Sequence, residues 1–314
     1  MDTLDIISLV VYGATILLGL PSNVLAFYVF YCRAKARLTP NLIYMINLCL
    51  SDLVFILFLP LKMLEVGKVY RSMPSVLCPL YNLIHFGTIY TSAGFLTVVS
   101  VGRFLGAAYP IRYQVYKKPC YSCLVSLGIW CLVGVHGVLI CVLEASKGAE
   151  SGLFASGDIS CYEFNTTELG VLAPIRLELS VVLFFLPLAI TSFCYAGCIR
   201  VLVGSHLHAR KKRRAVRVAV ATLSIFVLCF GPYNISHVVG FIYKEEVKWR
   251  RLAVLPSACN AFLDPLIFYF LSSAMDDGIA QVWRSLREKC SSIRLKVALA
   301  HGKRRSQPAI SGIA

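Results

Sequence analysis

The sequence predicts an all-α membrane protein, in which seven transmembrane helices form one bundle and a short amphipathic helix follows on the inner membrane surface. Hydrophobic residues make up 58% of the 314-residue chain and charged residues only 15%, and the mean hydropathy is +0.72. A soluble domain of this length could not bury so much apolar surface. The apolar residues also gather in seven runs of about 20 residues or more, which is the length that a helix needs to cross a bilayer.

Short polar segments separate the seven runs, so we expect neither a linker nor a second domain. The predicted spans are residues 6–31, 39–61, 76–102, 121–143, 174–199, 216–242 and 252–272. We assign residues 1–273 to the transmembrane bundle and residues 274–290 to the amphipathic helix, whose apolar residues share one stripe. Residues 291–314 are expected to form a disordered cytoplasmic tail.

Clusters of lysine and arginine predict the direction in which the chain crosses the membrane. They fall around Arg33, around Arg112, in residues 200–217 and in the C-terminal tail, all on one side of the seven crossings. That side is then cytoplasmic, and the amino terminus is extracellular. Most of the +15 formal charge lies there, which favours anionic lipid and an intracellular protein as partners over nucleic acid.

A charged residue near the end of an apolar span is the strongest indication of function. Arg176 lies near one end of the fifth run, and Lys248, Arg250 and Arg251 precede the seventh run at the same face of the membrane. Snorkelling of Arg176 to the lipid headgroups is the alternative explanation. Two cationic positions that face a shared cavity would form a clamp for a carboxylate, because a planar guanidinium can bind both carboxylate oxygens.

Polar residues at bilayer depth are functional candidates, because they are costly in lipid unless they find partners. Asn23 in the first span is expected to find its partner in Asp52 of the second span, and Asp264 beside Pro265 repeats the pattern in the seventh. A purely structural polar cluster is the alternative. Arg103 lies at the inner end of the third span by helical rise.

Three residues of the fourth and sixth spans are candidates for ligand contact. Tyr233 and His237 are four residues apart, so they share one face of a helix, outward of the bend that Pro232 predicts. His136 lies in the outer half of the fourth span. A lone histidine on an apolar face is more often a core residue than a ligand contact, and that alternative stays open.

The cysteines and one sequon predict covalent modifications. Cys78 and Cys161 are the only two of the thirteen cysteines that this topology places in extracellular segments, so we expect them to form a disulfide. Asn165 begins a glycosylation sequon on the outer side, and Cys290 is a candidate for palmitoylation. No pattern of histidine and cysteine predicts a metal site, and we expect no cofactor.

Together these motifs resemble the rhodopsin-like G-protein-coupled receptors across the entire chain. The resemblance rests on Asn23, the LSDL stretch with Asp52, Cys78 with Cys161, Arg103, Trp130, Pro187, Tyr195, the CFGP run that ends at Pro232, and Asp264-Pro265. More narrowly, RLTPNLIYMINL, GRFLGAAYPIRYQ, KKPCYS, LFFLPLAITSFCY and GPYNISHVVGF are similar to stretches of the free fatty acid receptors.

The resemblance implies a plasma-membrane receptor that binds a fatty acid carboxylate and activates a heterotrimeric G protein, and not an enzyme. Arginines at the positions of Arg176 and Arg250 bind the carboxylate in that family, helped by the residues at Tyr233 and His237. The other expected ligand contacts are Tyr90, His136 and Glu163. The residues expected to carry the switch and G-protein coupling are Arg103, Asp52, Asp264, Pro265 and Tyr195. Membrane lipid and arrestin are further expected partners.

Some positions depart from the wider family pattern. Gly102 stands where an acid usually precedes the arginine, so the ion pair that restrains Arg103 is missing and raised signalling without ligand is expected. Phe230 replaces the usual tryptophan of the sixth span, and Phe268 replaces a tyrosine of the seventh.

The sequence supports two predictions for the chain length of the preferred fatty acid. The Gly102-Arg103 pair, residues 103–121 and the fifth span are most similar to the medium- and long-chain receptor, which we favour together with a G protein of the calcium-raising class. The features similar to the short-chain receptors are His237, the CYE stretch that ends at Glu163, the PIRLEL stretch and NAFLDPLIFYF. An organic-anion transporter is the remoter alternative, because the chain has no internal repeat.

Overall fold

The computed structural model describes residues 2–67, 77–150, 169–205, 209–245 and 247–271. These residues are almost entirely helical, and no strand occurs among them. The α-helices are α1 (Thr3–Ala36), α2 (Pro40–Val66), α3 (Leu77–Ala108), α4 (Pro110–Tyr116), α5 (Pro119–Glu150), α6 (Leu169–Ser180), α7 (Leu186–Val203), α8 (Ala209–Ile225), α9 (Gly231–Tyr243) and α10 (Arg250–Leu271). The predicted amphipathic helix and tail, residues 274–290 and 291–314, lie outside the described residues.

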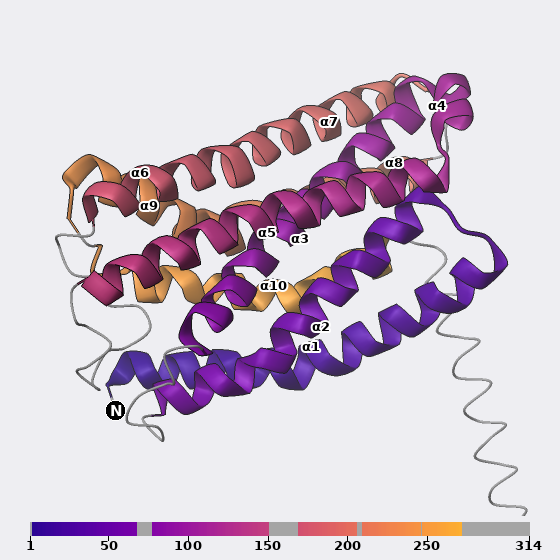
Figure 1. Ribbon diagram of the computed structural model, residues 1–314. Coiled ribbons are helices and arrows are strands. Elements are labelled where there is room, and N and C mark those ends of the chain that lie inside the picture. The colour runs from indigo at the N-terminus through magenta and orange to yellow at the C-terminus, as the bar shows by residue number, and fades with distance from the viewer. Residues whose placement is uncertain (1, 68–76, 151–168, 206–208, 246, 272–314) are drawn as a thin grey trace, which may run out of the picture. The chain divides into compact units, whose positions relative to one another are not determined.

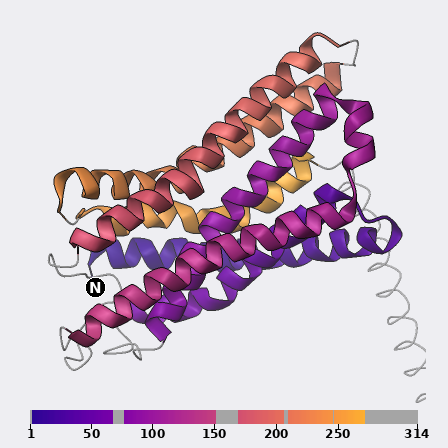
Figure 2. The same ribbon diagram turned by 45° about the horizontal axis from the view of Figure 1, so that its top comes forward.

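The long helices run side by side as a bundle, with α3 passing through its middle (Figures 1 and 2). α3 packs against α2, α5 and α7, α1 packs against α2 and α10, and α6 packs against α9. Six helical segments of the described part of the chain are long and apolar enough to cross a membrane. They confirm the first six predicted spans, and α10 occupies the seventh.

The bundle buries an apolar core, yet it also exposes large apolar side chains and buries polar ones. Large apolar side chains such as Leu17 and Leu57 are about three quarters exposed, at 75% and 74%, whereas Asn23, Ser100 and Asp264 are completely buried. Lipid accepts exposed leucine but leaves polar groups unsatisfied, so polar residues turn inward. The bundle is built for a lipid environment.

Two π-helical turns interrupt the helices that carry the candidate site. One covers Val181–Phe185 between α6 and α7, and the other covers Phe226–Phe230 between α8 and α9. Each comes just before a proline, Pro187 or Pro232, which has no N–H to donate and so interrupts the regular bonding pattern. The bend predicted at Pro232 thus takes the form of a wider turn, which sets the rotation of α9.

Asn23 has a different partner from the one predicted. Its Nδ2 donates to the carbonyl oxygen of Ala261 on α10 at 2.6 Å and to that of Gly19 at 3.0 Å, rather than to Asp52. The prediction was wrong because a side-chain amide can bond to any nearby carbonyl, and backbone carbonyls leave no mark in the sequence. Asn23 therefore joins α1 to α10.

Candidate ligand-binding site

The candidate site lies where α6, α9 and α10 come together, at the end of the bundle where α1 begins; we call this the Arg176 end. Arg176 is in the second turn of α6, Arg250 is the first residue of α10, and His237 is buried on α9. The imidazole of His237 is within electrostatic range of both guanidinium groups. Two cations from different helices therefore lie near one buried histidine.

An aromatic wall adjoins these cations. The rings of Tyr233 and His237 meet edge to face with centroids 4.4 Å apart, which confirms that the two residues share one face of the helix. Phe86 of α3 stacks on Tyr233 with centroids 5.0 Å apart and an interplanar angle of 8°. The two ring contacts hold the phenol ring in place, because each restricts its rotation.

Tyr90 of α3 lies near these aromatic rings and bonds to α9. Its hydroxyl donates to Oδ1 of Asn234 at 3.3 Å, and Nδ2 of Asn234 donates to the carbonyl oxygen of Phe230 at 2.9 Å. The ring is also within electrostatic range of Tyr233 and Arg176. Tyr90 therefore lies at the predicted site, where its hydroxyl links α3 to α9.

The guanidinium of Arg250 lies against the backbone of α9. Its Nη2 donates to the carbonyl oxygen of Ser236 at 3.5 Å. α9 ends at Tyr243, and the residue that caps it, Lys244, has a left-handed φ of 54°. α10 begins at Arg250, whose side chain lies against the helix that carries His237.

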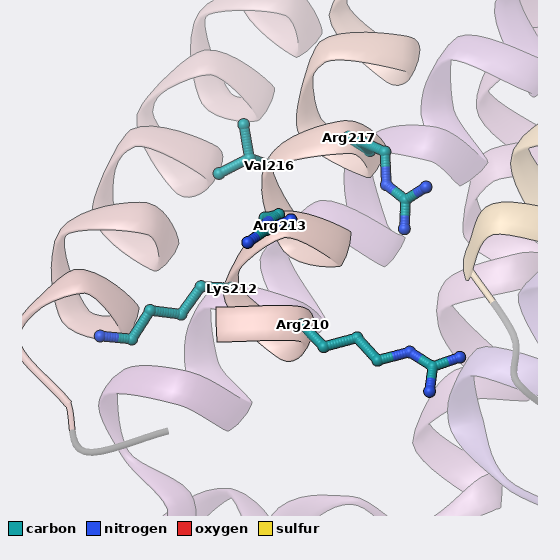
Figure 3. Close-up of a pocket in the computed structure, with 5 residues that line it drawn as sticks. All are labelled: Arg210, Lys212, Arg213, Val216 and Arg217. Atoms are coloured by element: carbon teal, nitrogen blue, oxygen red, sulfur yellow. The ribbon is translucent and has the colours of Figure 1, made fainter. Parts of the chain in front are cut away.

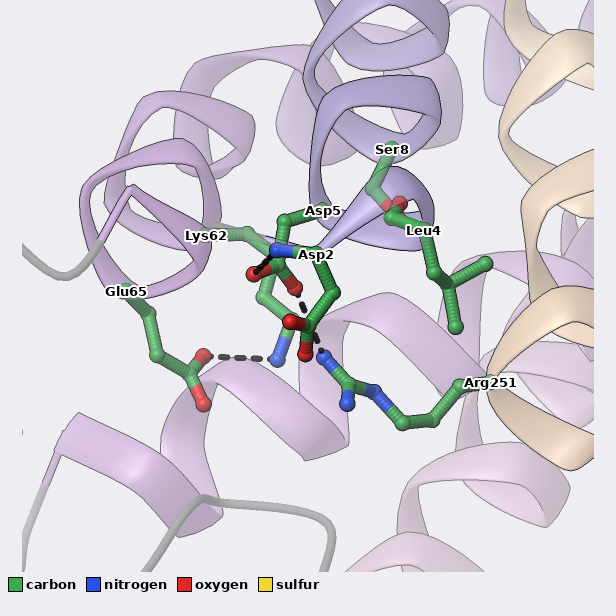
Figure 4. Close-up of polar contacts among 7 residues, drawn as sticks. All are labelled: Asp2, Leu4, Asp5, Ser8, Lys62, Glu65 and Arg251. Carbon is green, nitrogen blue, oxygen red and sulfur yellow. Dashed lines mark hydrogen bonds and ion pairs between the residues drawn. The ribbon is translucent and has the colours of Figure 1, made fainter. Parts of the chain in front are cut away.

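The other two cations near the start of α10, Lys248 and Arg251, do not join this group. Lys248 is exposed, and Nη2 of Arg251 donates to Oδ1 of the buried Asp5 at 3.3 Å (Figure 4). A second ion pair at this end joins Nζ of the buried Lys62 to Oε2 of Glu65 at 2.6 Å. Sequence reasoning did not single out Asp5 or Lys62, although a lysine inside the second apolar span was a usable signal.

His136 has a protein partner that sequence reasoning also missed. Its Nε2 lies 3.3 Å from Oε1 of Glu178 on α6, and its Nδ1 lies 2.7 Å from the carbonyl oxygen of Leu132. The His136 and Glu178 side chains are 21% and 48% exposed, so the pair bridges α5 and α6 on the outside of the bundle. Glu178 is an acid inside an apolar run, which is the same signal that drew attention to Arg176.

The predicted switch residues lie deeper in the bundle and toward its other end. Asp264 accepts a hydrogen bond from Nδ2 of Asn260 at 3.0 Å, and Asp52 is within electrostatic range of Asp264. The Tyr195 hydroxyl lies 3.2 Å from Oγ1 of Thr222. The Tyr195–Thr222 contact joins α7 to α8, whereas Asn260 and Asp264 lie on one helix, α10, and Asp52 lies on α2.

Arg103 lies at the end of the bundle opposite Arg176. Its Nε is buried and has no hydrogen-bond partner among the described residues. Tyr195, Cys198 and Arg214 are within electrostatic range of its guanidinium. The residue before it in the chain is Gly102, so no acid at that position can pair with the guanidinium.

A basic cavity of about 710 Å³ opens near the start of α8. Figure 3 shows that Lys212 and Arg210 extend in different directions around it. Its other lining residues are Arg213, Val216 and Arg217. Such a cavity suits an acidic partner, since no acid lies among the residues that line it.

Several predicted residues cannot be compared with the structure. Cys161, Glu163, Asn165 and Cys290 lie outside the described residues. Cys78 lies in the first turn of α3, but its side chain is outside them as well. Within the described part of the chain, no group of three or more His, Cys, Asp or Glu residues could hold a metal ion.

The chain is similar to known proteins over most of its length. Residues 22–268 match the family model described as 7 transmembrane receptor (rhodopsin family). Free fatty acid receptor 3 of Mus musculus is 38% identical over 291 residues, which are 92% of this chain and 90% of that protein. Free fatty acid receptor 1 of Rattus norvegicus is 39% identical over 297 residues, 91% of this chain and 98% of the relative.

The third free fatty acid receptor type is similar to the same degree. Free fatty acid receptor 2 of Mus musculus is 37% identical over 289 residues, 91% of this chain and 87% of that protein. The three types differ too little in identity to single out one of them. A protein of this family is a multi-pass membrane protein and not an enzyme. The family match and these relatives show that the chain belongs to the rhodopsin family of seven-transmembrane receptors, among the free fatty acid receptors.

Proposed function

We propose that the protein is a plasma-membrane receptor that binds the carboxylate of a free fatty acid between Arg176 and Arg250 and activates a heterotrimeric G protein. One observation carries the proposal: arginines from α6 and α10 both approach the buried His237. Tyr233 lies beside them and can supply a hydroxyl donor, while Tyr90 lies near Arg176 with its own hydroxyl bonded to Asn234. A carboxylate fits this group, because it accepts hydrogen bonds and its charge offsets the two cations.

The proposed orientation places the Arg176 end outside the cell. The extracellular side then holds the amino terminus, the Cys78–Cys161 disulfide, glycosylated Asn165 and Glu163. Cys290, the candidate for palmitoylation, lies inside. The basic cavity on α8 would face the cytoplasm, where the G protein, arrestin and anionic lipid headgroups are its candidate partners. Residues 1–273 form the receptor bundle, 274–290 the amphipathic helix and 291–314 the tail.

The preferred ligand is a medium- to long-chain acid, and the favoured G protein belongs to the calcium-raising class, with the inhibitory class second. A short-chain acid is the second candidate, and the His136–Glu178 pair favours it. A long tail that leaves the site between α5 and α6 would pass this polar pair and disturb its hydrogen bond. A short tail ends before it.

Dose-response curves in cells test the carboxylate clamp. Replacing Arg176 with alanine removes one of the two cations, so the potency of every active acid should fall by about a hundredfold or more. Surface expression, measured by antibody labelling of intact cells, should stay normal. An unchanged dose-response curve for Arg176→Ala at normal surface expression would rule out the carboxylate clamp.

An organic-anion transporter would also use two arginines, so a second assay separates the two functions. A receptor should promote nucleotide exchange on purified G protein when the acid is added to membranes. A transporter should instead accumulate labelled acid in sealed vesicles. Uptake without nucleotide exchange would contradict the receptor assignment.

A further inference from the structure

One buried stripe of α9 faces the candidate site. Tyr233, Ser236, His237 and Gly240 are buried and follow one another at intervals of three, one and three residues, which places them on a single face of the helix. Tyr233 and His237 belong to the proposed ligand site. Gly240 has no side chain, yet it completes the same face one turn further along.

The space beside Gly240 is filled by the guanidinium of Arg250. A Cβ atom at position 240 would lie 2.9 Å from Nη2 of Arg250, closer than the roughly 3.5 Å at which non-bonded heavy atoms normally pack. The same Nη2 donates to the carbonyl oxygen of Ser236 at 3.5 Å. The absence of a side chain therefore lets the guanidinium reach the helix backbone beside His237.

We propose that Gly240 is a positioning residue for Arg250: it leaves the room in which the guanidinium is held against α9, at the height where a ligand carboxylate binds. This inference rests on the proposed function, because it concerns the aim of one of the two arginines. Gly240 touches no ligand itself. It acts only through the place that Arg250 takes.

Helix formation does not explain a glycine here. Inside a helix, glycine is less favourable than alanine, so Gly240→Ala should strengthen α9. The atom that an added methyl meets is the far end of a flexible side chain, which can swing away without disturbing the fold. The expected damage is therefore to the direction of Arg250 and not to the amount of folded receptor.

A double-mutant comparison tests the inference. Fatty acid dose-response and surface expression are measured for the wild type, Gly240→Ala, Arg250→Lys and the double variant Gly240→Ala/Arg250→Lys. Lysine keeps the charge but has no Nη2 to meet the methyl group. We expect Gly240→Ala to lower potency by about tenfold in the arginine background, the size of one lost charged hydrogen bond. It should lower potency by less than about twofold in the Arg250→Lys background, where the side chain at position 250 no longer meets the methyl group at position 240.

The matched control is Gly134→Ala on α5, where an added Cβ would meet no atom within 4 Å. This variant should keep the wild-type potency. Unchanged potency in Gly240→Ala, or an equal loss in both backgrounds, would overturn the positioning role while leaving the receptor assignment intact. A loss of surface expression that Arg250→Lys does not restore would overturn it too. A wild type that fails to respond to any fatty acid would instead overturn the proposed function, and the inference with it.

Discussion

Arg250 and Arg251 are neighbours in the chain, yet their guanidinium groups bind different helices. Nη2 of Arg250 donates to the carbonyl oxygen of Ser236 on α9, and Nη2 of Arg251 donates to Asp5 on α1. Successive residues of a helix point about 100° apart, so two adjacent cations can serve two purposes. One turns to the proposed ligand site, and the other fastens α10 to α1.

This divergence makes the two arginines a matched pair of variants. Arg250→Ala should lower fatty acid potency by about a hundredfold or more, because a ligand carboxylate loses a cation in a buried site. Arg251→Ala should change potency by less than about threefold, since its guanidinium binds Asp5 on α1 and lies away from the proposed ligand site. Dose-response curves at matched surface expression check both values. Equal losses in the two variants would contradict the assignment of Arg250 alone to the site.

Signalling without ligand should depend on position 102. A Cβ added at Gly102 would lie 3.0 Å from the Tyr113 hydroxyl and 3.4 Å from Oδ1 of Asn41. Burial, and secondly the neighbouring Tyr44, raise the pKa of Tyr113 above its usual value, so the hydroxyl stays protonated at neutral pH and can donate to an acid. Gly102→Asp should therefore lower basal activity by restraining Arg103 and binding Tyr113.

The control for this effect is Gly102→Ala, which adds the same Cβ without a charge. Basal nucleotide exchange is measured for both variants at equal receptor amounts. A fall in Gly102→Asp that alanine does not reproduce supports the missing restraint. If alanine lowers basal exchange equally, crowding against Tyr113 is the cause and the electrostatic explanation fails.

The His136–Glu178 pair should limit the length of the ligand tail. A buried methylene contributes about 0.8 kcal/mol, so potency should climb with each carbon until the tail reaches this pair. Glu178→Leu replaces the acid with an apolar surface and should raise the potency of long acids while leaving acetate and propionate unchanged. A series of acids from acetate to stearate on both receptors measures this. If the potency of the wild type peaks at two to four carbons, the medium- and long-chain assignment is rejected. If Glu178→Leu raises the potency of all acids equally, the pair does not act on the tail.

The sequence predicted the parts of this structure that depend on local patterns. The membrane spans follow from runs of apolar residues, and the shared face of Tyr233 and His237 follows from their spacing of four. Partners that come from distant elements were not predictable. Arg251 with Asp5 and His136 with Glu178 join helices whose packing no periodicity reveals, and Asn23 bonds to a backbone carbonyl. Gly240 drew no notice because its role lies in the space it leaves.

The central claim is that Arg176 and Arg250 recognise the carboxylate itself. The most direct test compares the binding of a fatty acid and of the primary alcohol of equal chain length to purified receptor, in the wild type and in Arg176→Ala. The tails are matched, so the difference between the two ligands isolates the head group. We expect the wild type to bind the acid about a hundredfold more tightly than the alcohol. Arg176→Ala should lose most of this preference, while its binding of the alcohol stays as tight as in the wild type. An undiminished preference for the acid in Arg176→Ala would contradict recognition of the carboxylate by the two arginines.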